Sequence, residues 1–192
     1  MNHNIEVEKF GIKLRPVTFE DAAFIYNLRT DPDNSQYIGD TEQNISMQYQ
    51  WLESYFKREN DYYFCIDLKD NKNVGTIGIY NIKDGSGEWG RWVISKKYPV
   101  SPSSVWLIYE IAFNILNLND VYCRTVIDNK KVISFHERCG LNTAGIEKNG
   151  VIIKGERKDL LIHTLDKSNY KKVQYRLEKS ATFCERLLMR NE

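Results

Sequence analysis

The sequence lacks the features of several protein classes. Its 192 residues hold no apolar run near the ~20 residues that a transmembrane helix needs, and the polar start MNHNIEVEKF has no apolar signal-peptide core. A net charge of +1 gives no overall attraction to nucleic acid or to an anionic membrane. We therefore expect a cytoplasmic protein whose partners are neither nucleic acid nor membrane.

The four cysteines do not have the spacing of a metal site or a redox pair. Cys65, Cys123, Cys139 and Cys184 stand far apart and form no C-x-x-C pair. Zinc sites and redox couples usually need such paired spacing. We predict no metal, and we expect each cysteine to be a small buried hydrophobic residue.

The hydrophobic content and the pattern of strands and helices indicate a single α/β domain with one core. A hydrophobic content of 42% over 192 residues favours a single domain, and no repeat or linker divides the chain. Alternating or apolar runs predict strands at 12–17, 62–68, 73–82, 88–95, 121–127 and 158–165. Helical spacing predicts helices at 19–29, 46–56, 105–116, 129–139 and 168–189. Asn149-Gly150, flanked by apolar residues, predicts a two-residue hairpin turn.

The stretch from Val121 to Leu141 carries the most information. A short strand leads through Asp128-Asn129 into a helix that Gly140 ends. Asn129 and His136 lie seven residues apart on one face of that helix, separated by roughly 10 Å at about 1.5 Å per residue. This is about the span of an extended pantetheine arm.

This stretch resembles the GCN5-related N-acetyltransferase (GNAT) family. The family pattern is Asn, an apolar residue three on and Tyr seven on, then a charged pair and Gly with an aliphatic residue; here His136 replaces the Tyr. Val74 to Gly78 and Glu88 to Ile94 are similar to its third and fourth strands, and Leu14-Arg15-Pro16 to its opening strand. The matches run in the family's order from about Leu14 to Leu165.

The resemblance implies a fold and a cofactor. We expect a mixed α/β (α+β) acyl-CoA N-acyltransferase fold at 1–166, with a central, mostly antiparallel sheet and helices on both faces. A C-terminal helical extension at 167–192 would pack on the domain or form a homodimer contact. The implied reaction moves an acetyl group from acetyl-CoA to a primary amine, without metal.

Two residues are candidates for proton transfer. In a strand over 88–95, alternation would turn Glu88 and Trp92 to one side and Trp89 and Arg91 to the other. Glu88 falls where the family often has its catalytic base and would deprotonate the amine. His136 falls on the family's Tyr position, and an imidazole can protonate a leaving thiolate.

The predicted cofactor site departs from the family. The usual glycine-rich pyrophosphate loop is replaced by Lys96-Lys97-Tyr98-Pro99-Val100-Ser101-Pro102-Ser103-Ser104. A helix N-terminus still presents free N–H groups to an anion. The cofactor-binding candidates are the following: Val93, Ile94, Lys96, Lys97, Ser101, Ser103, Ser104 and Asn129.

The acceptor amine stays open at this level. Arg29, Trp51 and Trp89 are candidate substrate-binding residues. The pattern is closest to family members that act on ribosomal-protein alanine or on nucleotide-linked amino sugars, and His136 with Leu28-Arg29-Thr30 favours the sugar. A protein N-terminus or a small amine is the alternative acceptor. A third reading is a non-catalytic member of the fold that binds a ligand or partner.

Overall fold

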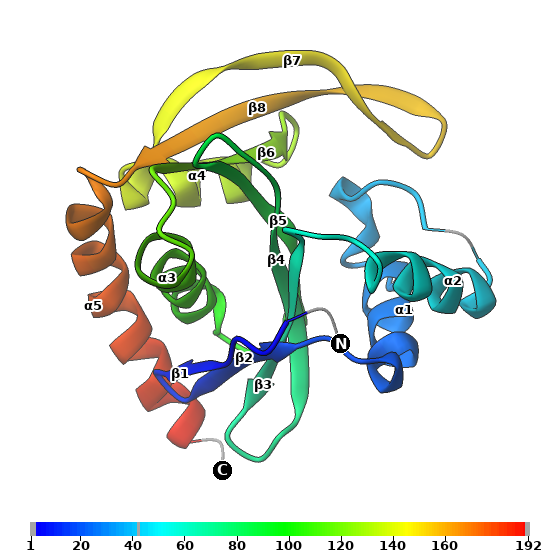
Figure 1. Cartoon of the computed structure of the whole chain (residues 1–192), viewed down its shortest axis with the longest axis horizontal. Coiled ribbons are helices and arrows are strands. Elements are labelled where there is room, and N and C mark those ends of the chain that lie inside the picture. The colour runs from blue at the N-terminus through cyan, green and yellow to red at the C-terminus, as the bar shows by residue number, and fades with distance from the viewer. Residues whose placement is uncertain (1–2, 42, 191–192) are drawn as a thin grey trace.

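One twisted sheet organises the molecule. The computed structural model describes residues 3–41 and 43–190. Its eight strands lie in the order β1-β2-β3-β4-β5-β6-β8-β7, antiparallel except for the parallel pair β5–β6 (Figure 1). The strands are β1 Val7–Lys9, β2 Ile12–Pro16, β3 Tyr62–Leu68, β4 Asn73–Lys83, β5 Ser86–Ile94, β6 Asp120–Val126, β7 Asn142–Ile153 and β8 Glu156–Asp166. This is the predicted mixed, mostly antiparallel sheet.

Helices cover both faces of the sheet, as predicted. Helices α1 and α2 lie on one side, and α3, α4 and α5 lie on the other (Figure 1). Their bounds are α1 Ala22–Thr30, α2 Ile45–Tyr55, α3 Ser101–Glu110, α4 Lys130–Cys139 and α5 Tyr170–Met189. Short 3-10 turns, η1 Phe19–Asp21 and η2 Ser35–Tyr37, flank α1, and η3 Ile111–Ile115 extends α3 as a π-helix. Among the described residues, no helix is long and apolar enough to cross a bilayer.

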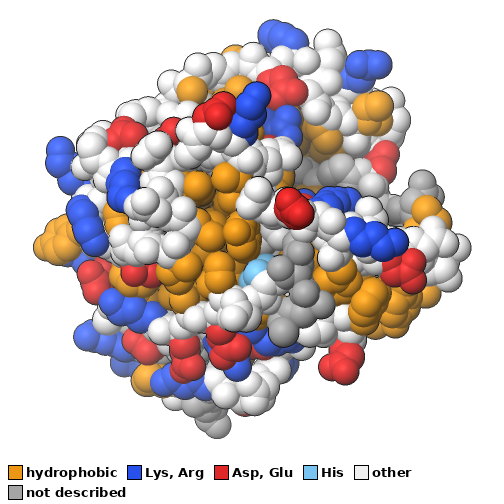
Figure 2. All heavy atoms as spheres, in the orientation of Figure 1, with side chains coloured by type: hydrophobic (Ala, Val, Ile, Leu, Met, Phe, Trp, Pro, Cys, Tyr) orange, Lys and Arg blue, Asp and Glu red, His pale blue; other side chains and the backbone are white. Residues whose placement is uncertain are grey.

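The main core lies between the sheet and α3. This helix begins at Ser101-Pro102, where proline at the first turn costs no hydrogen bond, and it is apolar on nearly all sides. Its one charge, Glu110, accepts hydrogen bonds from Tyr170 Oη at 2.8 Å and Gln174 Nε2 at 3.0 Å. Glu110 therefore anchors α5, whose buried stripe includes Val173, Leu177 and Ala181. Figure 2 shows hydrophobic side chains gathered between α3 and the sheet on this face.

The parallel strands β5 and β6 pair only at their beginnings. Pairing runs from Ser86 with Asp120 to Glu88 with Tyr122 and then stops. Beyond Glu88, β5 stays paired with β4 alone, while β6 pairs with β8. The backbone edge of β5 from Trp89 to Ile94 is thus left without a partner strand in the described part of the chain. An extended ligand could pair with this edge as an added strand does.

A bulge in β5 overturns the predicted alternation. Ile77 of β4 lies opposite both Arg91 and Trp92, and Arg91 takes a positive φ of 48°. An extra residue in a strand turns the following side chains to the other face. Trp89 and Trp92 therefore share the α3–α4 face, with ring centroids 5.7 Å apart, and Arg91 faces α2. The prediction that Trp92 lies on the side of Glu88 is wrong.

The predicted hairpin turn is also wrong. Asn149 and Gly150 lie inside β7, where the register with β8 shifts between Glu147 and Val151. The turn is made by Lys154 and Gly155, with positive φ of 52° and 78°. The irregularity at Asn149 and the turn at Lys154-Gly155 both need a left-handed backbone conformation. An Asn-Gly pair can adopt it in a bulge as readily as in a turn. The hairpin is therefore longer than expected, and it arches toward α1 and α2 (Figure 1).

Candidate active site

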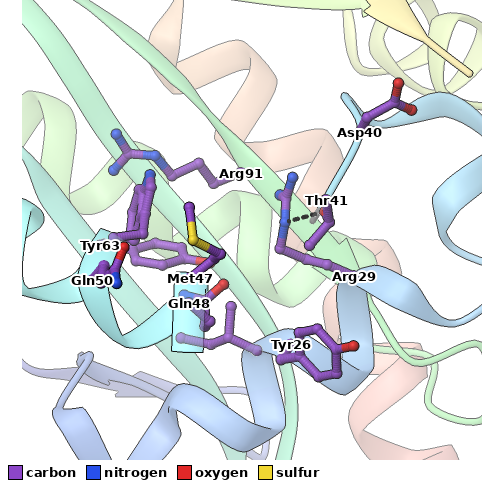
Figure 3. Close-up of a pocket in the computed structure, with 11 residues that line it drawn as sticks. Tyr26, Arg29, Asp40, Thr41, Met47, Gln48, Gln50, Tyr63 and Arg91 are labelled. Atoms are coloured by element: carbon purple, nitrogen blue, oxygen red, sulfur yellow. Dashed lines mark hydrogen bonds between the residues drawn. The ribbon is translucent and has the colours of Figure 1, made fainter. Parts of the chain in front are cut away.

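A cavity of about 530 Å³ lies between α1, α2 and the sheet. Its wall comes from α1, the segment after η2, α2, β3 and β5 (Figure 3). The lining residues are Ile25, Tyr26, Arg29, Asp40, Thr41, Met47, Gln48, Gln50, Trp51, Tyr63 and Arg91. Aromatic surface, amides and two guanidinium groups together suit a polar ligand that also offers apolar faces.

Arg29 projects from the end of α1 toward this cavity (Figure 3). Its Nε donates to Thr41 Oγ1 at 3.1 Å, and its Nη2 donates to the Gly39 carbonyl at 3.3 Å. Both acceptors are neutral. Among residues 3–41 and 43–190, no carboxylate forms an ion pair with Arg29, and Figure 3 shows the Asp40 carboxylate turned away from it. The predicted substrate-binding residue Arg29 thus brings a positive charge to the cavity wall.

Arg91 forms the opposite wall and has a carboxylate partner. Its guanidinium makes a two-pronged ion pair with Asp61, at 2.5 and 2.9 Å, and lies 4.2 Å from the Tyr80 ring centroid. Trp51 and Tyr63 rings approach the same guanidinium at 5.2 and 5.3 Å. Trp51, a predicted substrate-binding residue, therefore lines the cavity and packs on Arg91.

Glu88 is buried and held by three donors. Its Oε1 accepts from Arg124 Nε at 2.9 Å and Tyr80 Oη at 3.2 Å, and its Oε2 accepts from Asn81 Nδ2 at 3.0 Å. Burial and the Glu88 charge raise the pKa of Tyr80, so its hydroxyl remains a donor. Glu88 is 3% exposed. Its carboxylate is fixed in one orientation, with Oε2 accepting one described hydrogen bond and retaining a lone pair.

His136 lies on the other face of β5, within an aromatic cluster. Its ring centroid is 5.3 Å from those of Trp89 and His163, and its Nδ1 is buried without a hydrogen-bond partner among the described residues. Burial, and then the neighbouring His163, lower the pKa of His136 to about 3. The imidazole is therefore neutral at ordinary pH.

Trp89 does not line this cavity. It is 2% exposed and packs edge-on against Tyr109 and His136, on the α3–α4 side. Regular alternation with Glu88 places Trp89 on this face, and the bulge beyond it turns Arg91 to the opposite face. Of the three residues expected to bind substrate, the structure brings Arg29 and Trp51 together and leaves Trp89 in the core.

The residues predicted to bind a cofactor lie along the open part of β5 and beyond it. Val93 is buried and Ile94 half-buried, and they pair with Thr76 and Gly75 of β4. A Cβ on Gly75 would lie 2.7 Å from the Val93 carbonyl, so glycine permits this close strand pairing. The opposite backbone edge of both residues faces the gap in the sheet.

The start of α3 follows this edge. Ser103 and Ser104 are fully buried, and Ser104 Oγ donates to the Ser101 carbonyl at 3.0 Å and accepts from Trp92 Nε1 at 3.1 Å. Ser103 Oγ has no described partner. The Ser104 hydroxyl is therefore committed to the fold, and anion binding at this helix start would rest on main-chain N–H groups.

The other cofactor candidates lie at the surface. Lys96 Nζ is 3.0 Å from Asp33 Oδ1, and Lys97 is exposed. Asn129 caps α4, because its Oδ1 accepts from the Val132 N–H at 3.3 Å. Asn129 and His136 do lie on one helix as predicted, with His136 buried and Asn129 half-buried.

Sequence reasoning missed the polar network around Glu88. Arg91, Asp61, Tyr80 and Arg124 join the cavity wall to this carboxylate, yet they come from four separate segments. The one local signal was the run Glu88-Trp89-Gly90-Arg91, where Gly90 marks a strand irregularity. Among the described residues, no cluster of His, Cys, Asp or Glu could hold a metal ion.

Comparison with known proteins identifies the fold. A family model described as "Acetyltransferase (GNAT) domain" matches residues 12–142. The structure of apo FdhC, described as a nucleotide-linked sugar GNAT, has a TM-score of 0.76 and 28% identity, covering 95% of this chain and 99% of that one. Spermidine N-acetyltransferase from Vibrio cholerae, in complex with CoA and spermine, has a TM-score of 0.77 and 18% identity, covering 85% and 99%.

No curated protein sequence matches the chain. The family model nevertheless spans more than half of its length, and both solved structures share its architecture. The resemblance drawn from Asn129, Glu88 and the order of the strands is confirmed. The chain belongs to the GNAT acetyltransferase family.

Proposed function

We propose that the protein transfers an acetyl group from acetyl-CoA to the primary amine of a nucleotide-linked amino sugar. The observation that carries the choice of acceptor is Arg29, which lines the 530 Å³ cavity and, among the described residues, donates only to neutral acceptors. A guanidinium in such a setting favours an anionic group on the ligand. A nucleotide-linked sugar supplies both the amine and the anion.

The residues present fit acetyl-CoA. Within the described residues, the backbone edge of β5 from Trp89 to Ile94 has no partner strand, and a pantetheine arm could hydrogen-bond to it. The start of α3 follows at Ser101 and offers main-chain N–H groups to a pyrophosphate. When bound, acetyl-CoA supplies an activated thioester carbonyl that an amine can attack.

Glu88 is the proposed general base. The acceptor amine must lose its proton before it can attack, and a buried carboxylate fixed by Arg124, Tyr80 and Asn81 can receive that proton directly or through a water. The three donors keep the carboxylate in one orientation, which lowers the cost of reaching the productive geometry. Main-chain N–H groups of β5 would polarise the thioester carbonyl.

His136 is proposed to serve the leaving thiolate as a neutral imidazole. With its pKa near 3, the imidazolium form is scarce at ordinary pH, so proton delivery from a charged ring is disfavoured. A neutral ring still carries one N–H and can donate a hydrogen bond to sulfur. In this form His136 would stabilise the developing thiolate without itself titrating.

The alternatives differ in what the cavity should hold. A polyamine acceptor, such as the spermine in the Vibrio cholerae structure, is a polycation and is disfavoured by Arg29, which forms no ion pair among the described residues. A protein N-terminus or another small amine would need no diphosphate site. A non-catalytic role would leave acetyl-CoA unbound or unused.

The test is turnover with three different acceptors. Thiol release from acetyl-CoA is followed with a nucleotide-linked amino sugar, the same sugar without its nucleotide, and spermidine. We expect kcat/KM for the nucleotide-linked sugar to exceed that for the free sugar by about 100-fold or more, since the free sugar lacks the charge-assisted contacts that a diphosphate would make with the Arg29 guanidinium. Equal rates with all three amines would contradict the proposed acceptor specificity. If no thiol were released with any amine, the proposed acetyltransferase activity would be wrong.

A further inference from the structure

A second cavity, of about 310 Å³, opens beside the first. The two share Arg29, Asp40 and Thr41, so that they form adjoining parts of one site. The far wall of the second cavity is the turn of the β7–β8 hairpin, at Lys154 and Gly155. The remaining lining is largely polar and comes from Thr30, Ser35, Ile38, Gly39 and Gln43.

The charges around this cavity favour an anion. Arg29 lies in the wall that joins the two cavities, and Lys154 lies across from it on the exposed hairpin turn. Among the residues that the structure describes, neither cation forms an ion pair. The one described carboxylate in the lining is Asp40, whose Oδ1 already accepts from the Lys154 main-chain N–H at 2.8 Å.

That hydrogen bond also fixes the hairpin turn over the segment after α1. Tyr37 and Val151 pack against a small apolar cluster of Val126, Ile153 and Leu160, which joins the same two parts of the chain. The Lys154 backbone is therefore held in place before any ligand arrives. A preorganised cation loses less entropy on binding than one on a free loop.

We propose that this second cavity binds the diphosphate of the acceptor, between Arg29 and Lys154. The proposal rests on the proposed function for the identity of the acceptor. In this arrangement the amino sugar occupies the first cavity, and the nucleoside part extends out of the second cavity beneath the hairpin turn. The β7–β8 turn then contributes to acceptor specificity, because the Lys154 ammonium group would form an ion pair only with an acceptor that carries phosphate.

The direct test is binding of uridine diphosphate, and separately of pyrophosphate, by calorimetry. Saturating CoA is present throughout, so that the cofactor's own pyrophosphate site is filled. We expect Lys154→Gln to weaken diphosphate binding about five- to tenfold, and Arg29→Gln to weaken it at least as much. Added salt should weaken wild-type binding more steeply than Lys154→Gln binding.

Lys148→Gln is the matched control. Lys148 lies on β7, the strand that leads into the turn, outside both cavities and with its Nζ 2.7 Å from Asp159 Oδ2. This variant should bind diphosphate within twofold of wild type. Wild-type protein that does not bind diphosphate, or Lys154→Gln protein that binds it as tightly as the control does, would overturn the proposal.

A kinetic measurement separates this proposal from the proposed function. With the nucleotide-linked sugar, Lys154→Gln should raise KM and leave kcat unchanged; with the free sugar it should change neither. Acetyl transfer to amines without diphosphate binding would overturn only the subsite. Diphosphate binding that depends on Lys154, without transfer to any amine, would overturn only the catalytic function.

Discussion

The two faces of β5 differ sharply in chemistry. On the face toward α2, Arg91 and Glu88 belong to a polar network that reaches the cavity wall. On the face toward α3 and α4, Trp89 and Trp92 pack with His136 in an aromatic cluster. Both sets of side chains come from five consecutive residues.

The bulge at Arg91 explains how one short strand serves both faces. A regular strand would put Glu88 and Trp92 on one side, whereas the extra residue lets Glu88 and Arg91 share the polar side. Asn81 of β4 takes a positive φ of 53° where the β4–β5 register shifts again, and it donates to Glu88. Two irregularities therefore flank the proposed base, and such strained positions cluster at functional sites.

The largest effect should come from breaking the polar face at Asp61. Asp61→Ala leaves the guanidinium of Arg91 buried without its two-pronged partner. Removing one member of a buried ion pair costs about 3 kcal/mol or more, because the remaining charge stays desolvated. Urea unfolding of the purified variant, monitored by tryptophan fluorescence, measures this loss.

Arg58→Ala is the control for that prediction. Arg58 also contacts Asp61, at 3.4 Å, but its side chain is 39% exposed. Exposed ion pairs contribute about 0.5 kcal/mol. If both variants lowered the free energy of unfolding equally, the contrast between the buried and exposed partners of Asp61 would be wrong.

The next effect concerns catalysis at Glu88. Glu88→Gln keeps the size of the side chain and removes its ability to accept a proton. We expect kcat to fall by about 100-fold. The free energy of unfolding should fall less than in Asp61→Ala, because Arg124 is partly exposed and keeps Glu147 as an ion-pair partner. Glu147→Gln is the control, because Glu147 contacts Arg124 from the exposed side and should change kcat less than about twofold. A loss of under about tenfold for Glu88→Gln would refute its role as base.

Much of the fold could be predicted from local patterns. The Asn129 to Gly140 helix was predicted almost to the residue, since Asn caps its start and Gly140 takes φ of 97° at its end. Pro102 marked the start of α3, and the stripe including Val173 and Leu177 predicted the buried face of α5. These signals depend on neighbours in sequence, so a single chain contains them.

The candidate site could be predicted only in part. Arg29 and Trp51, which the sequence singled out, both line the cavity, but the environment of Glu88 depends on Arg124 and Asn81, which folding brings together from separate strands. The sides on which Arg91 and Trp92 lie depend on a bulge whose positive φ falls on Arg91. Arginine does not favour that conformation, so the residue type at this position did not predict a bulge.

Burial of His136 on the aromatic face of β5 should make the free energy of unfolding depend on pH. The unfolded His136 imidazole titrates near pH 6.5, whereas burial lowers its pKa to about 3 in the folded protein. Between these values the unfolded state binds a proton that the folded state rejects. The stabilising contribution is thus complete above about pH 6.5 and is lost as the pH falls toward 3. At about pH 5.5 the loss should reach about 1 kcal/mol.

The comparison variant is His136→Gln, which cannot titrate. Urea unfolding at about pH 7.5 and pH 5.5 gives the pH-dependent loss for each protein, and the variant should lose about 1 kcal/mol less than wild type. The buried His163, whose pKa burial also lowers, remains in both proteins. Identical losses would show that His136 is not buried as a neutral ring.

The smallest effect tests the hydrogen bond that holds the bulge itself. Thr76 is fully buried, and its Oγ1 donates to the Arg91 carbonyl at 2.9 Å. Thr76→Val preserves shape but leaves this carbonyl without its donor, so the free energy of unfolding should fall by about 1 kcal/mol. Thr76→Ser retains the hydroxyl and serves as the control for the bond. Because the bulge orients the open edge of β5, Thr76→Val should also raise KM for acetyl-CoA, whereas Thr76→Ser should not. A variant with unchanged stability and KM would mean that strand pairing alone maintains the bulge, and that the two faces of β5 do not depend on Thr76.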